Sequence, residues 1–242
     1  MSNLTFRTSV GVKAIPELCV GNDRAVLAAA RVSTQGVESM SALDAAEPDA
    51  STGLIRFLMK NRHGTPFEHN SFTFLVEAPI FVFREFHRHR IGWSYNEESG
   101  RYKQLAPTFY LPSPNRNLVQ VGRPGAYHYD PGTIEQYELT TEAIKLSCAD
   151  SYGAYQRMLD AGIAREIARS VLPLNIFTSM YATCNVRSLM AFLSLRTNRP
   201  EAHFPSKPQR EIEMVAELME QHFAARFPIT YDAFCEFGRV AP

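Results

Sequence analysis

Residues 88–102 read RHRIGWSYNEESGRY, and this stretch guides the interpretation of the whole chain. Three arginines and one histidine stand beside two carboxylates, two serine hydroxyls and one amide. Guanidinium groups bind phosphate through paired hydrogen bonds, and hydroxyl and amide groups can hydrogen-bond to a planar polar ring. The combination indicates a site for an anionic ligand, and it fits a nucleotide better than it fits a charged surface.

The composition is typical of a globular protein with a sizeable core. The chain has 242 residues, of which 45% are hydrophobic and 21% are charged. This size allows one large domain or two small ones, and because no repeat or low-complexity linker is visible we expect a single domain over residues 1–242. The formal net charge is zero, so the molecule as a whole offers no long-range attraction for nucleic acid.

The four cysteines are far apart in the sequence and form no Cys-x-x-Cys pair, so neither a zinc site nor a disulfide framework is indicated. We expect buried thiols. No apolar segment approaches the ~18 residues of a membrane span, and no signal-peptide core is visible. We therefore expect a cytoplasmic protein without membrane contact.

Hydrophobic spacing predicts mixed α and β elements. Residues 71–76 alternate as a strand does, residues 101–130 contain four prolines and favour a long irregular loop, and residues 176–183 fit either a strand or a continuing helix. A short helix carrying Arg165 and Arg169 is expected before Pro173. Longer helices are predicted over residues 23–32, 51–63 (with Ser51 as the cap), 134–161, 185–195 and 208–223. This mixture indicates an α+β fold.

Arg187 and Arg196 are nine residues apart on a predicted helix, and at 100° per residue they project to opposite sides. The helix could therefore run between two sites or along a subunit boundary. The alternative, which the sequence alone favours, is that each arginine extends from one helix end into water.

Other interpretations of the basic stretch compete with a nucleotide site. His87 and His89, with His63 and His69 upstream, could bind a metal, but the surrounding arginines oppose a divalent cation, so no metal site is expected. Arginines paired with nearby glutamates could also form a solvated surface, although the interleaved neutral donors weaken that alternative. No partner groups identify Ser94 or Ser99 as a nucleophile.

Four segments, taken in order, resemble the flavin-dependent thymidylate synthases. The family signature runs Arg-His-Arg, a short spacer, Ser, and then Arg-Tyr. The matching segments are residues 30–33 (ARVS), 63–69 (HGTPFEH), 88–102, and 168–175 (ARSVLPLN) with 185–196.

The resemblance implies a single-domain α+β fold with a central mixed or antiparallel sheet flanked by helices. It implies an FAD enzyme that methylates dUMP with methylenetetrahydrofolate and NADPH as co-substrates and without a protein nucleophile. It also implies a homotetramer in which subunits share the sites.

The resemblance assigns roles by position. Arg196 would be the catalytic residue that favours ionisation of the uracil N3, and Glu97 would lie between flavin and nucleotide. Ala191 stands where many members place an asparagine or histidine near the flavin. The further flavin contacts would be Ser33, His63, Thr65, Arg88, His89, Arg90, Asn185 and Arg187. The dUMP contacts would be Glu85, Arg88, Glu97, Glu98, Ser99, Gly100, Arg101, Arg169 and Arg196.

Two further departures from the family pattern lead to specific expectations. The spacer from Arg90 to Ser99 is one residue longer than usual, and Trp93 is expected to be the extra residue. Glu85 replaces a common glutamine, and its carboxylate would repel a phosphate unless an arginine neutralises it. Two alternatives stay open: a flavin-binding homologue without synthase activity, and a nucleic-acid-binding module that uses the basic stretch.

Overall fold

The computed structural model describes residues 3–41 and 48–242, and the chain divides into two compact units. The first unit is formed by the residues up to Ser9 with Pro79–Phe81 and Glu98–Thr178. The second unit is formed by Val10–Ala78, Val82–Glu97 and Ser179–Pro242. The α+β class is confirmed, whereas the single-domain organisation over residues 1–242 stays a prediction.

The second unit is built on a four-stranded sheet with the order β2-β3-β8-β4. β2 pairs antiparallel with β3, and β4 pairs antiparallel with β8. β3 is buried along most of its length, whereas β4 alternates half-buried and exposed residues, as an edge strand does. The strands are β2 (Gly11–Ala14), β3 (Phe72–Pro79), β8 (Phe177–Cys184) and β4 (Trp93–Glu97). The strand alternative for residues 176–183 is thereby confirmed.

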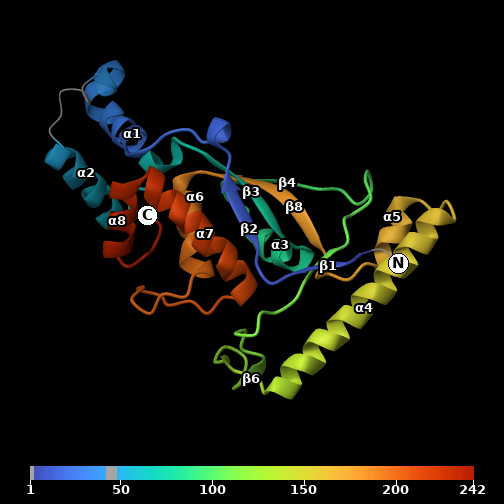
Figure 1. Cartoon of the computed structure of the whole chain (residues 1–242). Coiled ribbons are helices and arrows are strands. Elements are labelled where there is room, and N and C mark those ends of the chain that lie inside the picture. The colour runs from blue at the N-terminus through green and yellow to red at the C-terminus, as the bar shows by residue number, and fades with distance from the viewer. Residues whose placement is uncertain (1–2, 42–47) are drawn as a thin grey trace. The chain divides into compact units, whose positions relative to one another are not determined.

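Figure 1 shows α1, α2 and α8 gathered as one helical group to the left of this sheet. α7 packs against β2 and α6 with a buried stripe formed by Ile212, Val215, Met219 and Phe223, whose spacing of three or four residues keeps them on one helix face. The helices are α1 (Asp23–Gln35), α2 (Pro48–Lys60), α3 (Ile80–Phe86), α6 (Val186–Arg196), α7 (Arg210–Arg226) and α8 (Pro228–Glu236), with short 3-10 helices at Pro16–Leu18, Gly36–Ser39 and Thr65–Glu68.

α8 was not predicted, and a residue more than two hundred positions away determines where it begins. The carboxylate of Asp23 accepts hydrogen bonds from the amides of Ile229 and Thr230, both at 3.0 Å, and from the Thr230 hydroxyl at 2.6 Å. A carboxylate on the amides of a first helical turn acts as an N-terminal cap. The cap that starts α8 is therefore supplied from α1.

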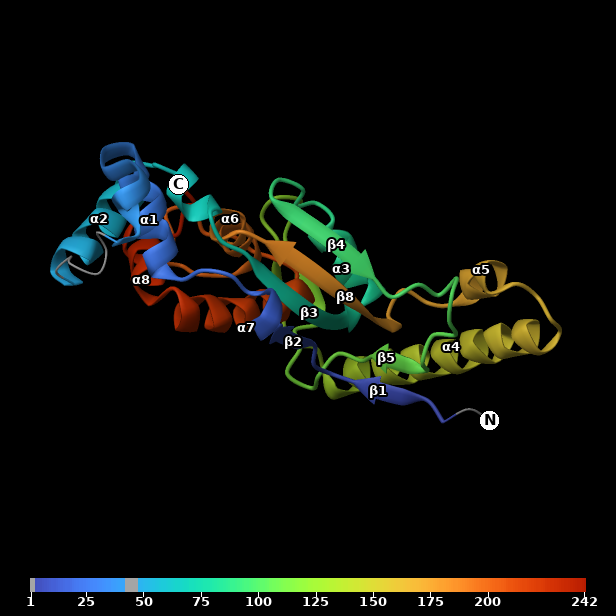
Figure 2. The ribbon, with the colours of Figure 1, turned by 90° about the horizontal axis from the view of Figure 1, so that it is seen from above.

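The first unit centres on α4 (Ile134–Asp160), which Figure 2 shows with β1 and β5 alongside it. β1 (Thr5–Arg7) and β5 (Thr108–Tyr110) pair in parallel, and β6 (Val119–Val121) and β7 (His128–Asp130) form an antiparallel pair. After α4 come α5 (Arg165–Ala168) and a 3-10 helix at Arg169–Val171. The core of this unit contains Leu105, Phe109, Cys148, Tyr152, Tyr155, Ala168 and Ile176.

The structure corrects two expectations about local elements. α2 begins at Pro48, so Ser51 lies inside the helix and is not its cap. Proline is favoured in the first turn of a helix because its fixed φ matches the helical value. Residues 101–130 are not one irregular loop, because β5, β6 and β7 lie within them. Each of these strands has three residues, which is too short for a periodic pattern to be visible.

Among the described residues, no helix combines the length and the apolar character needed to cross a membrane.

Candidate functional site

The turn that follows α3 carries Arg88, His89 and Arg90 and is held from two sides. The Tyr95 hydroxyl lies 2.7 Å from the carbonyl oxygen of His89 and 3.0 Å from that of Phe86. From the other side, the Ser188 hydroxyl donates to the carbonyl of Ile91 at 2.9 Å. The main chain of the basic triplet is thus fixed by β4 and by α6.

Gly92 makes the close approach to α6 possible. Its φ is +69°, in the left-handed region, and a Cβ atom there would lie 2.1 Å from the Ser188 Oγ. Any side chain would clash as well as strain the backbone. The turn therefore requires glycine at this position.

Trp93, expected as the extra residue of the motif, is a paired strand residue. It lies opposite Cys184 in the β4–β8 register, and its ring stacks on Tyr95 with the ring centroids 5.8 Å apart. Phe86 and Phe192 complete the aromatic cluster, with ring centroids 6.2 and 5.4 Å from that of Trp93. Burial, with a smaller contribution from Cys184, raises the pKa of Tyr95, so its hydroxyl stays protonated near neutral pH.

Arg196 is held by an acid and an imidazole at the end of α6. Its Nη1 lies 2.6 Å from Oε2 of Glu85, and its Nε donates to Nε2 of His89 at 3.0 Å. The side chains of Arg196 and Glu85 are 16% and 34% exposed, so the pair is partly shielded from water. Arg196 thereby neutralises the carboxylate that was expected to repel a phosphate.

Burial, and to a smaller extent the charge of Arg196, lowers the pKa of His89 to about 4. His89 is consequently neutral near pH 7, and its Nε2 is free to accept the hydrogen bond from Arg196. Since only one nitrogen of a neutral imidazole carries a proton, this contact assigns the proton to Nδ1.

The pKa of His89 predicts a pH dependence of folding. Between about pH 6.5 and pH 4 the unfolded chain binds a proton at this imidazole and the folded chain does not, so the free energy of unfolding should fall as the pH drops through this window. Denaturant unfolding at several pH values would measure the fall, which should be smaller in His89→Gln. Parallel curves for the two proteins would contradict the assignment.

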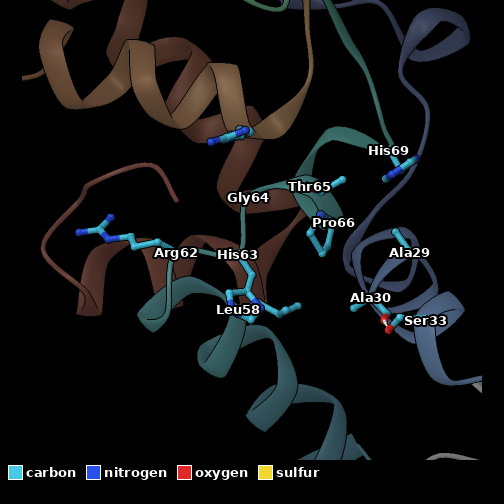
Figure 3. Close-up of a pocket in the computed structure, with 11 residues that line it drawn as sticks. Ala29, Ala30, Ser33, Leu58, Arg62, His63, Gly64, Thr65, Pro66 and His69 are labelled. Carbon is cyan, nitrogen blue, oxygen red and sulfur yellow. Dashed lines mark hydrogen bonds between the residues drawn. The ribbon is translucent and has the colours of Figure 1, made fainter.

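A separate cavity of about 530 Å³ lies in the second unit. Figure 3 shows Ala30 and Ser33 of α1 opposite Leu58 and His63 at the end of α2, with Thr65 and Pro66 beside them. Four of the predicted flavin contacts line it, namely Ser33, His63, Thr65 and Arg187. The other lining residues are Ala29, Ala30, Leu58, Arg62, Gly64, Pro66 and His69.

Arg187 is fixed at the wall of this cavity. Its Nη1 lies 2.6 Å from Oε1 of Glu68, and its Nε donates to the main-chain oxygen of Pro242 at 2.6 Å. The guanidinium lies against Gly64, where a Cβ atom would be 2.5 Å from both Cζ and Nε. Gly64 therefore leaves the space that Arg187 occupies.

Arg187 and Arg196 stand at opposite ends of α6, about 14 Å apart along its axis at about 1.5 Å per residue. Arg187 contacts Glu68 and Pro242, whereas Arg196 contacts Glu85 and His89. The two arginines therefore serve two places, and the preferred expectation that each simply extends into water is wrong.

The first unit brings four of the predicted nucleotide contacts together. A Cβ atom on Gly100 would lie 3.4 Å from Cδ of Arg169, and the Ser99 hydroxyl accepts from the amide of Arg101 at 3.2 Å. The Arg101 guanidinium pairs with Glu166 at 2.8 Å. Glu98 is the fifth predicted nucleotide contact in this unit, and it pairs with Lys103 at 2.8 Å.

The remaining predicted contacts do not line the cavity. Asn185 caps α6 by accepting from the amide of Ser188 at 2.8 Å, and Glu97 ends β4 half-buried. The other three, Arg88, Arg90 and Ala191, are exposed. Over residues 3–41 and 48–242, no group of three or more His, Cys, Asp or Glu is placed to hold a metal.

Sequence reasoning missed several residues that shape these sites. Glu68, His69, Tyr95 and Ser188 lie inside the quoted segments, so their proximity to predicted contacts was an available signal. Arg62 and Glu166 lie outside those segments and gave no such signal, because their contacts depend on the tertiary structure.

Comparisons with known proteins support the family resemblance. A family model described as "Thymidylate synthase complementing protein" matches residues 17–229. The flavin-dependent thymidylate synthase of Streptomyces avermitilis is 57% identical over 238 residues, covering 98% of this chain and 96% of its own. That of Tropheryma whipplei (strain TW08/27) is 53% identical over 221 residues, with 91% of each chain covered.

A solved structure is similar over the whole length. The UMP/dUMP methylase PolB from Streptomyces cacaoi, crystallised with 5-Br dUMP, superposes with a TM-score of 0.92 at 48% identity, covering 99% of this chain and 100% of that one.

The fold and the matches together define a flavin-dependent enzyme of the methyltransferase class. The chain belongs to the family of flavin-dependent thymidylate synthases.

Proposed function

We propose that this chain converts dUMP to dTMP with FAD as cofactor, methylenetetrahydrofolate as carbon donor and NADPH as reductant. The observation that carries the proposal is the fixed guanidinium of Arg196, held by Glu85 and His89. A cation fixed before the substrate arrives stabilises developing negative charge without a reorganisation cost.

The cavity residues suit a flavin dinucleotide. A volume of about 530 Å³ lies within the range of small-molecule pockets. Arg187 offers charge for a phosphate, and the side chains of Ser33, His63 and Thr65 offer hydrogen-bonding groups for ribose or a ring. When bound, the flavin would supply the reducing equivalents for the transferred carbon.

The role of Arg196 follows from the chemistry of the pyrimidine. A guanidinium beside N3 and O4 favours the anionic ring, and the added electron density at C5 lets that carbon attack without a protein nucleophile. The neutral His89 and the charged Glu85 fix the orientation of Arg196. The residues near Arg196 thus position and polarise the substrate.

The predicted dUMP contacts in the first unit offer groups that suit a phosphate. Arg101 and Arg169 supply charge and Ser99 supplies a hydroxyl. Since Arg101 pairs with Glu166 at 2.8 Å and its side chain is 59% exposed, the phosphate must replace a solvent-screened ion pair.

A homotetramer with shared sites accounts for the predicted flavin contacts that do not line the cavity. Arg88, Arg90 and Ala191 are exposed within one chain, and another subunit could bring them to a flavin. α4 also exposes Leu139 and Leu146, at 67% and 60%, as an interface would require. The cytoplasmic location stays a prediction.

The proposal predicts a protein that binds FAD and responds to dUMP. We expect flavin absorbance after reconstitution, a spectral shift on adding dUMP, and dTMP formation once methylenetetrahydrofolate and NADPH are present. Tritium release from labelled dUMP measures turnover directly. A protein that takes up no flavin would overturn the proposal, and one that binds flavin and dUMP without turnover would be a homologue that lacks synthase activity.

UMP is a second candidate substrate, because the PolB protein that is 48% identical is described as a UMP/dUMP methylase. The same assay with UMP in place of dUMP compares the two nucleotides.

A further inference from the structure

Arg62 adopts a backbone conformation that L-residues seldom occupy. Its φ is +61°, at the end of α2, where its amide donates to the carbonyl of Met59 at 3.2 Å and the amide of His63 donates to that of Leu58 at 2.9 Å. This pair of bonds is the Schellman ending of a helix, whose left-handed residue is usually glycine. An arginine here is strained, and strained residues of this kind cluster at functional sites.

The Arg62 side chain reaches the far end of the chain. Its Nη1 donates to the main-chain oxygen of Val240 at 2.6 Å and lies 3.3 Å from that of Ala241. Figure 3 shows this side chain extending away from His63 and Ser33. Arg62 therefore ties the segment Val240–Pro242 to the end of α2.

The residue before this segment is anchored independently. Arg239 is only 4% exposed, and its Nη2 pairs with Oε1 of Glu220 at 2.6 Å. Its carbonyl accepts from the Ser194 hydroxyl at 2.5 Å. Val240–Pro242 is thus held at its start by Arg239 and along its length by Arg62.

The end of the same segment contacts a residue of the cavity wall. The Pro242 oxygen accepts from Nε of Arg187 at 2.6 Å, and Arg187 lines the cavity. The main-chain oxygen fixes one edge of the guanidinium, while Glu68 takes another. A shift of Val240–Pro242 would release the first of these contacts.

We propose that Arg62 is a positioning residue of the flavin pocket, which holds Val240–Pro242 so that Pro242 fixes Arg187. The inference rests on the proposed function, because the ligand it concerns is FAD. The competing explanation is that the contact of Arg62 with Val240–Pro242 only stabilises the fold.

Arg62→Gly separates these two roles. Glycine relieves the positive φ, so the melting temperature of the flavin-free protein should stay the same or rise, whereas FAD affinity should fall about fivefold or more. Lys60→Ala is the matched control, because it removes one positive charge from the same helix end and should leave FAD affinity unchanged. A lower melting temperature with unchanged FAD affinity would overturn the proposal.

A double-mutant cycle tests whether Arg62 acts through the segment. Removing residues 240–242 should weaken FAD binding, and Arg62→Gly should then add no further loss. An equal further loss in the shortened chain would mean that Arg62 acts on the ligand directly, which overturns the route through Pro242. Absence of FAD binding by the unchanged protein would instead overturn the proposed function itself.

Discussion

Replacing Arg196 with alanine is expected to lower the kcat for dTMP formation by about 100-fold or more. The loss of one preorganised donor to a developing anion costs about 10²–10³ in kcat, and Arg196 is the cation proposed for the uracil. Flavin uptake should persist, since Arg196 lies at the other end of α6 from the cavity. Steady-state dTMP formation and the flavin spectrum measure the two outcomes.

Two controls separate the charge of Arg196 from its geometry. Arg196→Lys keeps the charge but has no planar fork for Glu85 and His89, so its kcat should be intermediate. Arg210→Ala removes an arginine whose partners are Glu213 and Glu217 on α7, and its kcat should be unchanged. Near-normal turnover of Arg196→Ala would remove Arg196 from the mechanism.

Replacing Gly64 with alanine should weaken FAD binding about tenfold or more, which is about 1.4 kcal/mol. The added Cβ would lie 2.5 Å from the guanidinium of Arg187, which must therefore move from its contacts with Glu68 and Pro242. The backbone itself is not strained by alanine, since φ is −75° and ψ is −35° at this position. Titration with FAD and a thermal melt of the flavin-free protein measure binding and folding separately.

Gly53→Ala is the matched control for this substitution. Gly53 lies inside α2, and a Cβ atom there would meet nothing within 4 Å. The change should stabilise the helix by about 0.5–1 kcal/mol and leave FAD affinity unchanged. If Gly64→Ala binds FAD as Gly53→Ala does, the space at Gly64 is not needed for the flavin.

The elements that the sequence predicted well are those with a local pattern. The helices now seen as α4, α6 and α7 follow apolar spacing, and Asn185 gives α6 a visible start. α8 escaped prediction because its cap, Asp23, is far away in the sequence. β1 was missed because three residues are too few to show alternation, and its partner β5 lies about a hundred positions later.

The candidate site also contains residues that sequence motifs predicted and residues that depend on distant contacts. Ser33, His63, Thr65 and Arg187 were predicted from motifs and line one cavity. Arg62 could not be predicted, because a left-handed position is indicated by glycine and this chain has arginine there. Glu85 and His89 bind Arg196, which lies more than a hundred positions later in the sequence. Spacing along the chain cannot predict a contact between residues so far apart.

The aromatic cluster beside the basic turn gives the enzyme an optical probe of its own. Trp93 is the single tryptophan of the chain, and it packs against Tyr95, whose hydroxyl holds the carbonyl of His89. Its fluorescence therefore reports on one place, the turn that carries Arg88 to Arg90. Because tryptophan emission overlaps flavin absorption, quenching of this one emitter can follow FAD as it binds, in the unlabelled protein and in real time.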